Sequence, residues 1–263
     1  MAQNIHPTSI IEEGAVIGDN VRIGPFCYIT KKVVIGSGTT IASHVLIEGN
    51  TKIGKNNRIF AHSAIGTIPQ DLKYHGEEVE LIIGDENVIR EFAQINPGTE
   101  GGGRVTRIGN KNLLMGYVHV GHDVQIGDQC ILANGTTLAG HVEMGDHVMI
   151  GGLSAIHQFV KLGDYAMLAG ASALAQDIPP YCMAEGNRAT LRGLNLTGLR
   201  REISREEINA LKSAYKELFE RGKPLQECAE RLASEKQSIH VTRLSEFIKN
   251  SKRGIPFTRK MNV

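Results

Sequence analysis

The chain has 263 residues, enough for one long domain or two ordinary ones, and a formal net charge of +1. This balance argues against an overall field that draws the protein to nucleic acid or to a membrane surface. We expect no membrane insertion, because no apolar run is long enough to span a bilayer and the N-terminus does not resemble a secretion signal. The four cysteines are scattered without a CxxC pair, which suits a reducing compartment, so a cytoplasmic globular protein is expected.

The first two thirds of the chain carry an aliphatic residue at every sixth position. Isoleucine fills each such position from Ile5 to Ile65, and the register resumes from Ile83 to Ile95 and again from Ile108 to Leu174. A period of six matches neither the helix period near 3.6 nor the strand period of two. It predicts a parallel β-helix, in which three hexads form a triangular coil of about 18 residues and the periodic side chains stack inward.

Two stretches interrupt the hexads, and each is expected to leave the β-helix as a loop. The first covers about residues 67–81 and reads TIPQDLKYHGEEVEL, and the second covers about 97–107 and reads PGTEGGGRVTR. Insertions in a solenoid often carry its function. The glycine run of the second loop is not a phosphate-binding P-loop, since no Lys-Ser/Thr pair follows it. For this loop, a functional role and a tolerated surface loop remain equally open.

After about residue 186 the hexads end and helical patterns begin. Ser204 and Glu207 have the spacing of a capping box, and apolar residues follow at helical intervals. A second helix is expected from near Pro224 and a third over about 241–252. The predicted organisation is therefore a β-helix over residues 1–186, with the two loop insertions, and a small helical domain over 187–263.

Histidines gather in the last run of hexads, at His119, His122, His141 and His157. Stacking of the coils is expected to bring these imidazoles near one edge of the β-helix. Three neutral imidazoles could bind zinc, or one could act as a general base near neutral pH. Asp123 directly follows His122 and could orient that ring, but adjacent strand residues point to opposite faces, so such a pair requires a bend. The residues themselves leave both chemistries open.

Several motifs together resemble one enzyme family. The hexads combine with IPQDLKY, VHVGHD, ILANGTTLAGHVEMGD, GGLSAIHQFVKLGD and YCMAEGNRATLRGLNLTGLRR, as in the family of acyl-carrier-protein:UDP-N-acetylglucosamine O-acyltransferases. Hexads alone are shared by many acyltransferases, but this combination is specific and covers essentially the whole chain. The resemblance implies a left-handed parallel β-helix followed by a small C-terminal α-helical domain. It also implies transfer of an (R)-3-hydroxyacyl group from acyl carrier protein to the 3-hydroxyl of UDP-N-acetylglucosamine, the first step of lipid A biosynthesis.

The resemblance assigns three catalytic roles. His122 matches the family's general base, Asp123 its orienting carboxylate, and Gly140 the backbone N–H that stabilises the oxyanion. No covalent acyl-enzyme is implied. No cofactor is implied either, beyond the phosphopantetheine of acyl carrier protein that holds the acyl donor.

Further positions match the family's substrate contacts. Asp71 and Lys73 correspond to substrate contacts, and chemically Asp71 could accept from sugar hydroxyls and Lys73 could face the anionic diphosphate. Gly170 corresponds to the base of the acyl groove, where a larger side chain would shorten the groove. Nucleotide-side and carrier-side contacts in the helical tail correspond to Asn195 and Arg201. The full set of implied substrate-binding residues is Gln70, Asp71, Lys73, His119, His141, His157, Gln158, Gly170, Asn195 and Arg201.

Three positions depart from the family pattern. Asn96 stands where a histidine is expected, Thr197 where an acidic residue is expected, and Glu202 where an arginine is expected. No role is carried onto them, and they put the nucleotide contacts in doubt.

The resemblance implies a homotrimer with active sites between subunits, and acyl carrier protein as a partner. Arginines near the start of the tail would steer this acidic protein toward the site. Three alternatives stay open. They are an amide-forming transferase that acts on a 3-amino UDP-sugar, a zinc-dependent hexapeptide-repeat carbonic anhydrase, and a non-catalytic scaffold.

Overall fold

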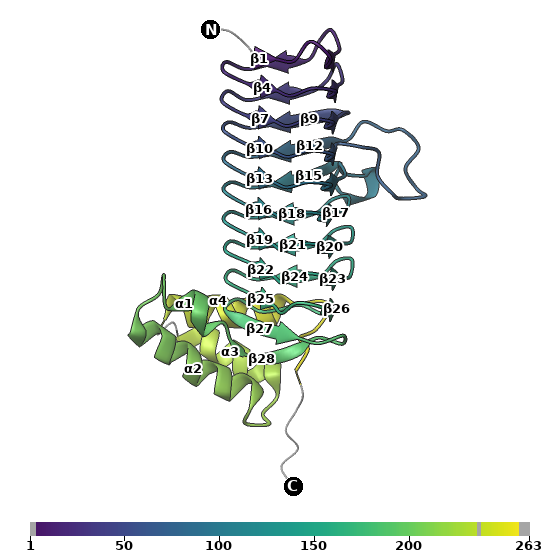
Figure 1. Cartoon of the computed structure of the whole chain (residues 1–263). Coiled ribbons are helices and arrows are strands. Elements are labelled where there is room, and N and C mark those ends of the chain that lie inside the picture. The colour runs from purple at the N-terminus through teal and green to yellow at the C-terminus, as the bar shows by residue number, and fades with distance from the viewer. Residues whose placement is uncertain (1–3, 236–237, 258–263) are drawn as a thin grey trace.

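A computed structural model describes residues 4–235 and 238–257 of the chain. They form a tall stack of parallel coils that starts near the N-terminus and ends against a group of helices (Figure 1). The predicted parallel β-helix is therefore present, and the helices lie at its C-terminal end.

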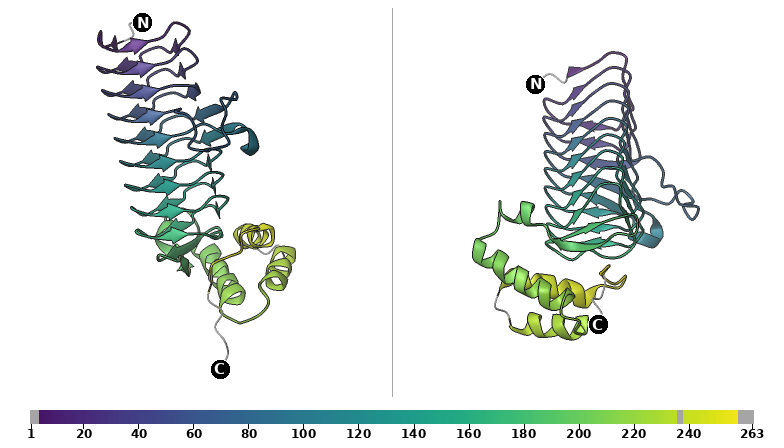
Figure 2. Two further views of the ribbon diagram at one scale, coloured as in Figure 1. Left: turned by 90° about the vertical axis from the view of Figure 1, so that its right-hand side faces the viewer. Right: turned by 60° about the horizontal axis from the view of Figure 1, so that its bottom comes forward.

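Three sheets form the three sides of the stack (Figure 2). The first sheet contains β1 (Asn4–Ile5), β4 (Arg22–Ile23), β7 (Thr40–Ile41), β10 (Arg58–Ile59), β13 (Val88–Ile89), β16 (Leu113–Leu114), β19 (Ile131–Leu132), β22 (Met149–Ile150), β25 (Met167–Leu168), β27 (Cys182–Glu185) and β28 (Thr190–Leu194). The second contains β2 (Ile10–Ile11), β5 (Tyr28–Ile29), β8 (Leu46–Ile47), β11 (Ala64–Ile65), β14 (Gln94–Ile95), β17 (His119–Val120), β20 (Thr137–Leu138), β23 (Ala155–Ile156) and β26 (Ala173–Leu174). The third contains β3 (Val16–Ile17), β6 (Val34–Ile35), β9 (Asn50–Ile53), β12 (Glu80–Ile83), β15 (Val105–Ile108), β18 (Gln125–Ile126), β21 (Glu143–Met144) and β24 (Lys161–Leu162).

The hexad aliphatics form the core of the stack. Each is the inward-facing residue of a short strand, and it stands in register with its counterpart one coil away. Ile29, Ile47 and Ile65 are one such column, and all three are fully buried. A single coil cannot bury its own interior, so each column gains its burial from the coils above and below.

Both insertions leave from the corner between the second and third sheets. The first lies between β11 and β12, and the second lies between β14 and β15 and contains the short 3-10 helix η1 (Glu100–Gly102). Because Ile95 is paired with Val120, the second insertion begins directly above the bend that follows Val120. That bend carries His122 and Asp123, so the loops and these side chains share one corner.

After the last coil, the residues that the structure describes form a β-hairpin and four helices. β27 pairs in parallel with β25 and antiparallel with β28. The helices are α1 (Leu196–Leu199), α2 (Arg205–Phe219), α3 (Leu225–Glu235) and α4 (Ile239–Asn250). None of the helices in the described part of the chain is long and apolar enough to cross a bilayer.

Half of the predicted capping box is present at the start of α2. The Ser204 hydroxyl accepts from the Glu207 N–H at 3.3 Å. The Glu207 carboxylate, however, accepts from the hydroxyl of Ser238, which is itself the N-cap of α4. One glutamate therefore ties the starts of two helices together.

Candidate active site

The histidines lie at the corner between the second and third sheets, on three successive coils. We call the bends at residues 121–124, 139–142 and 157–160 the histidine corner. The pairing of β17, β20 and β23 sets the register, with His119 opposite Thr137 and Thr137 opposite Ala155. Two columns follow from this register. His122, Gly140 and Gln158 form one, and Asp123, His141 and Phe159 form the other.

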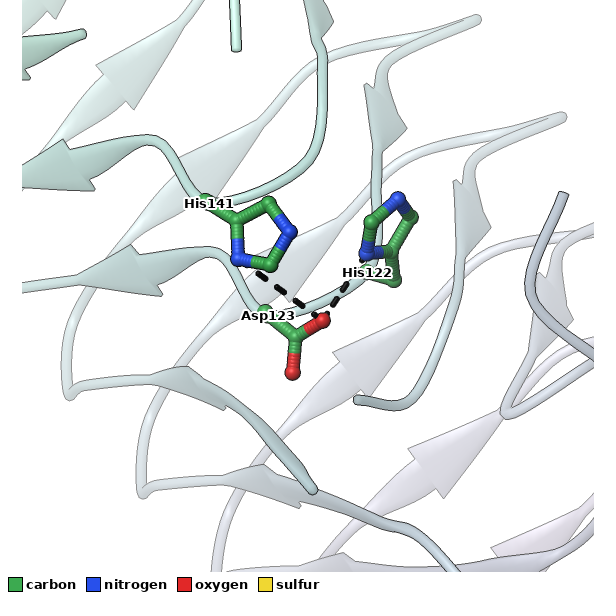
Figure 3. A group of neighbouring side chains, drawn as sticks. All are labelled: His122, Asp123 and His141. Carbon is green, nitrogen blue, oxygen red and sulfur yellow. Dashed lines mark hydrogen bonds and ion pairs between the residues drawn. The ribbon is translucent and has the colours of Figure 1, made fainter. Parts of the chain in front are cut away.

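His122 and Asp123 form a hydrogen-bonded pair. His122 Nδ1 lies 2.8 Å from Asp123 Oδ2 (Figure 3). Neighbouring side chains of a regular strand cannot meet in this way, but Asp123 has a left-handed backbone with a φ of 60°. The bend turns its carboxylate back toward the preceding ring. If Nδ1 donates to the carboxylate, then Nε2 is the free basic nitrogen.

The Asp123 carboxylate is fully buried and held from several sides. The Thr99 N–H donates to Oδ1 at 2.9 Å, the Thr99 hydroxyl donates to Oδ2 at 2.6 Å, and the Asp123 N–H donates to the hydroxyl of Thr106 at 2.8 Å. Burial alone would raise the pKa of Asp123, but the hydrogen bonds from His122 and Thr99 outweigh it and lower the pKa. The group is thus an ionised acceptor at neutral pH.

His141 stands on the coil below and faces the same carboxylate. Its Nδ1 is 3.9 Å from Asp123 Oδ2, and its ring stacks on Phe159 with centroids 4.4 Å apart. Burial lowers the pKa of His141, partly offset by the charge of Asp123, so the ring is mostly neutral at pH 7. Charges of Asp71 and Lys73 in the first inserted loop also act on it, which places this loop within electrostatic reach of the histidine corner.

His122, Asp123 and His141 could in principle hold a metal ion, since their donor atoms lie within 4.8 Å of one another. They are the one such group in residues 4–235 and 238–257. Asp123, however, already accepts two hydrogen bonds from Thr99 and one from His122. A metal would have to displace some of these bonds, so the observed arrangement fits a His–Asp pair better than a metal centre.

Gly140 lies against the His122 ring. A Cβ at this position would lie 2.5 Å from His122 Cε1 and Nε2, closer than real Cβ contacts. Gly140 is buried, and its N–H has no hydrogen-bond acceptor among the residues that the structure describes. Buried backbone N–H groups are rarely left unpaired. A free donor beside the ring of a candidate base is what an oxyanion requires.

Other predicted site residues lie near the pair but outside it. His119 is on β17, and its pKa is lowered by burial and by the neighbouring His122. His157 and Gln158 are exposed, and His157 Nδ1 lies 3.2 Å from the carbonyl of Gln158. Within the described chain no hydrogen bond, ion pair or ring stacking joins His157 to His141. The predicted gathering of all the imidazoles is therefore only partly realised, because His157 falls two residues short of the column that contains His141.

The inserted loop and the tail hold the remaining predicted residues. Gln70 is exposed and donates to Gln94 at 3.1 Å, and Asp71 accepts from the Lys73 N–H at 3.0 Å in a tight turn. Arg201 is exposed just after α1, whereas Asn195 is buried at the start of that helix. The Asn195 amide is used internally, since it donates to the Tyr165 carbonyl and accepts from the Gly198 N–H.

Gly170 follows β25, at the corner between the first and second sheets. This is a different corner from that of His122, and a Cβ at Gly170 would meet the Gly152 carbonyl oxygen at 3.3 Å. A single chain thus does not bring Gly170, Asn195 or Arg201 together with the His122–Asp123 pair.

The three residues that depart from the family pattern differ in their surroundings. Asn96 is only 1% exposed, and its amide N–H group donates to the carbonyls of Thr67 and Ile68 at 2.9 and 3.1 Å. It therefore anchors the start of the first insertion. Thr197 and Glu202 are exposed on and just after α1.

Sequence reasoning missed the residues that surround Asp123. Thr99 and Gly102 lie in the second insertion, whose role the sequence left open, and Thr106 lies on β15. The insertion breaks the hexad count, so no spacing rule could place these residues. Phe159 was also missed, although its position one coil after His141 was a usable signal.

Comparisons with known proteins match this architecture. Residues 177–256 match the family model described as "Udp N-acetylglucosamine O-acyltransferase; Domain 2", and residues 4–31, 14–49 and 106–140 match "Bacterial transferase hexapeptide (six repeats)". The chain is 73% identical over 256 residues to the acyl-(acyl-carrier-protein)–UDP-N-acetylglucosamine O-acyltransferase of Sulfurovum sp. (strain NBC37-1), covering 97% of this chain and 98% of the relative. This chain belongs to that O-acyltransferase family.

A further relative and a solved structure agree with this assignment in sequence and in structure. The relative from Aliarcobacter butzleri is 64% identical over an alignment that covers 98% of this chain and 99% of the relative. The solved UDP-N-acetylglucosamine acyltransferase from Campylobacter jejuni superimposes with a TM-score of 0.94 at 47% identity, over 97% of this chain and 100% of that one. The predicted fold class, a left-handed parallel β-helix with a small C-terminal helical domain, is confirmed, and the chain is an acyltransferase.

Proposed function

We propose that this enzyme transfers an (R)-3-hydroxyacyl group from the thioester of acyl carrier protein to the 3-hydroxyl of UDP-N-acetylglucosamine, as the first step of lipid A biosynthesis. Family membership supports the two substrates, because its relatives are named for them. The single observation that carries the chemistry is the His122–Asp123 pair with Nδ1 on the carboxylate and Nε2 beside Gly140.

His122 acts as the general base in this proposal. A sugar hydroxyl is a weak nucleophile until its proton is removed during attack, and one placed imidazole contributes about 10²–10⁴ in rate. With Nδ1 bonded to Asp123, Nε2 accepts the hydroxyl proton. The carboxylate holds the ring in this tautomer and stabilises the imidazolium that forms. The imidazolium then returns the proton to the departing thiolate.

Gly140 supplies the oxyanion donor. Attack on the thioester carbonyl places negative charge on its oxygen, and a fixed N–H stabilises that charge in the transition state. The Gly140 N–H has no acceptor within the described chain, and it lies next to the ring that takes the proton. Glycine is required here because a side chain would overlap His122.

Substrate binding is proposed to complete the site between chains. Half-buried Asp71 and exposed Lys73 lie on the first inserted loop, within electrostatic reach of His141, where they suit sugar hydroxyls and an anionic diphosphate. Asn195 and Arg201 lie where the helical tail begins, at the C-terminal end of the coil stack, and Gly170 lies on another corner. We therefore propose a homotrimer in which the tail of one subunit approaches the histidine corner of another. The acyl donor arrives on the phosphopantetheine of its carrier protein, without a further cofactor.

The test is the replacement of His122. His122→Ala is expected to lower kcat by about 10²–10⁴, because attack then proceeds without a general base. His147→Ala serves as the control, since His147 stacks on Tyr165 at a different corner. For both variants we would measure product formation from UDP-N-acetylglucosamine and hydroxyacyl carrier protein by mass spectrometry. The oligomeric state of each variant would also be measured. Near-normal turnover by a folded His122→Ala protein would remove His122 from the mechanism.

A further inference from the structure

The second inserted loop closes directly over the Asp123 carboxylate. Both polar groups of Thr99 reach it, with the N–H on Oδ1 at 2.9 Å and the hydroxyl on Oδ2 at 2.6 Å. Thr99 itself is only 4% exposed. Gly102 comes so near that a Cβ there would overlap the carboxylate. The loop thus covers the side of Asp123 that does not face His122.

The Thr99 hydroxyl could serve as a helix cap at this position, but it does not. Thr99 is the N-cap residue of η1, where a threonine side chain commonly bonds an N–H of the first turn. Here the side chain makes no capping bond. The loop is closed instead by the Thr99 carbonyl, which accepts from the N–H groups of Gly102 and Arg104. The hydroxyl is therefore committed to Asp123 alone.

These bonds define the orientation of the carboxylate. An aspartate that bonds only one partner can rotate about its last side-chain torsion, which has a broad energy well. Thr99 holds both oxygens at once, so one orientation remains, with Oδ2 toward His122 Nδ1. Asp123 cannot turn without leaving the Thr99 donors buried and unpaired, which is costly.

We propose that Thr99 is a positioning residue of the active site, whose N–H and hydroxyl lock Asp123 in the orientation that aims His122 at the acceptor hydroxyl. Thr99 touches neither substrate nor reacting atom and acts through Asp123. The inference rests on the proposed roles of His122 and Asp123, and it gives the second insertion a function in the reaction.

Replacing Thr99 by valine removes the hydroxyl with little change in shape. Thr99→Val is expected to lower kcat about tenfold or more, with the KM values for both substrates within about twofold, because orientation affects the chemical step and not ground-state binding. Thr99→Ser keeps the hydroxyl and is expected to retain activity within about twofold. Thr99→Ala is the second hydroxyl-free variant, for the case in which valine prevents folding. The control is Thr39→Val, which removes another fully buried hydroxyl, one that donates to the Gly54 carbonyl and accepts from the Asn57 N–H away from the site.

A double-mutant cycle separates positioning from loop stability. If Thr99 acts through Asp123, then Thr99→Val has no further effect on kcat in an Asp123→Ala background, whereas a purely structural defect would multiply with it. Multiplicative effects, equal losses in the serine and valine variants, or full activity of Thr99→Val would each overturn the inference. If Asp123→Ala is impaired while Thr99→Val is normal, only the role of Thr99 fails. If Asp123→Ala itself is fully active, the proposed catalytic pair fails with it.

Discussion

At the scale of single residues, a left-handed bend brings His122 and Asp123 together as the proposed catalytic pair. Asp123 has a φ of 60°, and His141 has a φ of 61° at the equivalent position one coil below. A non-glycine residue adopts this conformation at a cost, which the surrounding structure must offset. Here it turns both side chains toward one point beside His122 (Figure 3). The backbone, as much as the residue types, thus decides the geometry of the pair.

Gly140 offers a test of this geometry at one atom. Gly140→Ala would place a methyl group 2.5 Å from His122 Nε2, so the ring must move away from its position. A misplacement near 1 Å can cost about 10²-fold in rate, and a loss of kcat of that order is expected with little change in melting temperature. Gly101→Ala is the control, since a Cβ there meets nothing within 4 Å. Steady-state kinetics with unaltered kcat for Gly140→Ala would contradict the proposed contact.

At the scale of elements, the hexads made the strands predictable because each strand buries one aliphatic side chain per hexad. The pairing of His122 with Asp123 could be predicted only on the condition that the chain bends there, since the sequence does not reveal a positive φ at Asp123. The place of Thr99 could not be predicted at all. Its contact with Asp123 spans an insertion, and inserted residues obey no periodic register.

For the same reason, the sequence does not predict a ladder of buried asparagines inside the β-helix. Asn57 accepts from the Asn87 N–H, Asn87 from the Asn112 N–H, and Asn112 from the Cys130 N–H, at 2.7–2.9 Å. Their side-chain amides donate to the carbonyls of glycines one coil further along. The steps are 30, 25 and 18 residues, because the first two cross the insertions. A spacing that changes twice does not read as a repeat.

The ladder is expected to contribute to stability and not to catalysis. Asn87→Ala would leave the buried Asn112 N–H and the half-buried Gly109 carbonyl without these partners, and an unpaired buried group costs about 1–3 kcal/mol. We expect the free energy of unfolding to fall by about 3 kcal/mol, with kcat of the folded protein unchanged. Denaturant unfolding would measure it, with exposed Asn134→Ala as the control. Equal stability of the two variants would show that the ladder carries no net energy.

At the scale of the whole molecule, the helices close the open end of the coil stack (Figure 2). Tyr181 sits at this junction, fully buried, and its hydroxyl lies 3.0 Å from Nδ1 of His240 on α4. Asp177 adds a second tie, since it accepts from the Lys161 N–H of the last coils and from the Ser251 hydroxyl after α4. An exposed final coil would leave its apolar columns in water, and these contacts hold the cover in place.

The junction should therefore decide whether the β-helix and the helices unfold together. Tyr181→Phe loses one hydrogen bond, about 1 kcal/mol, whereas Tyr181→Ala also opens a cavity and should cost about 3–5 kcal/mol. Differential scanning calorimetry is expected to show one transition for the native protein and for Tyr181→Phe. For Tyr181→Ala it should show an earlier, separate transition of the helices, because a solenoid retains its coil-to-coil contacts when its end cap is loosened. A single transition shifted as a whole in Tyr181→Ala would mean that other contacts, such as those of Asp177, couple the two parts without Tyr181.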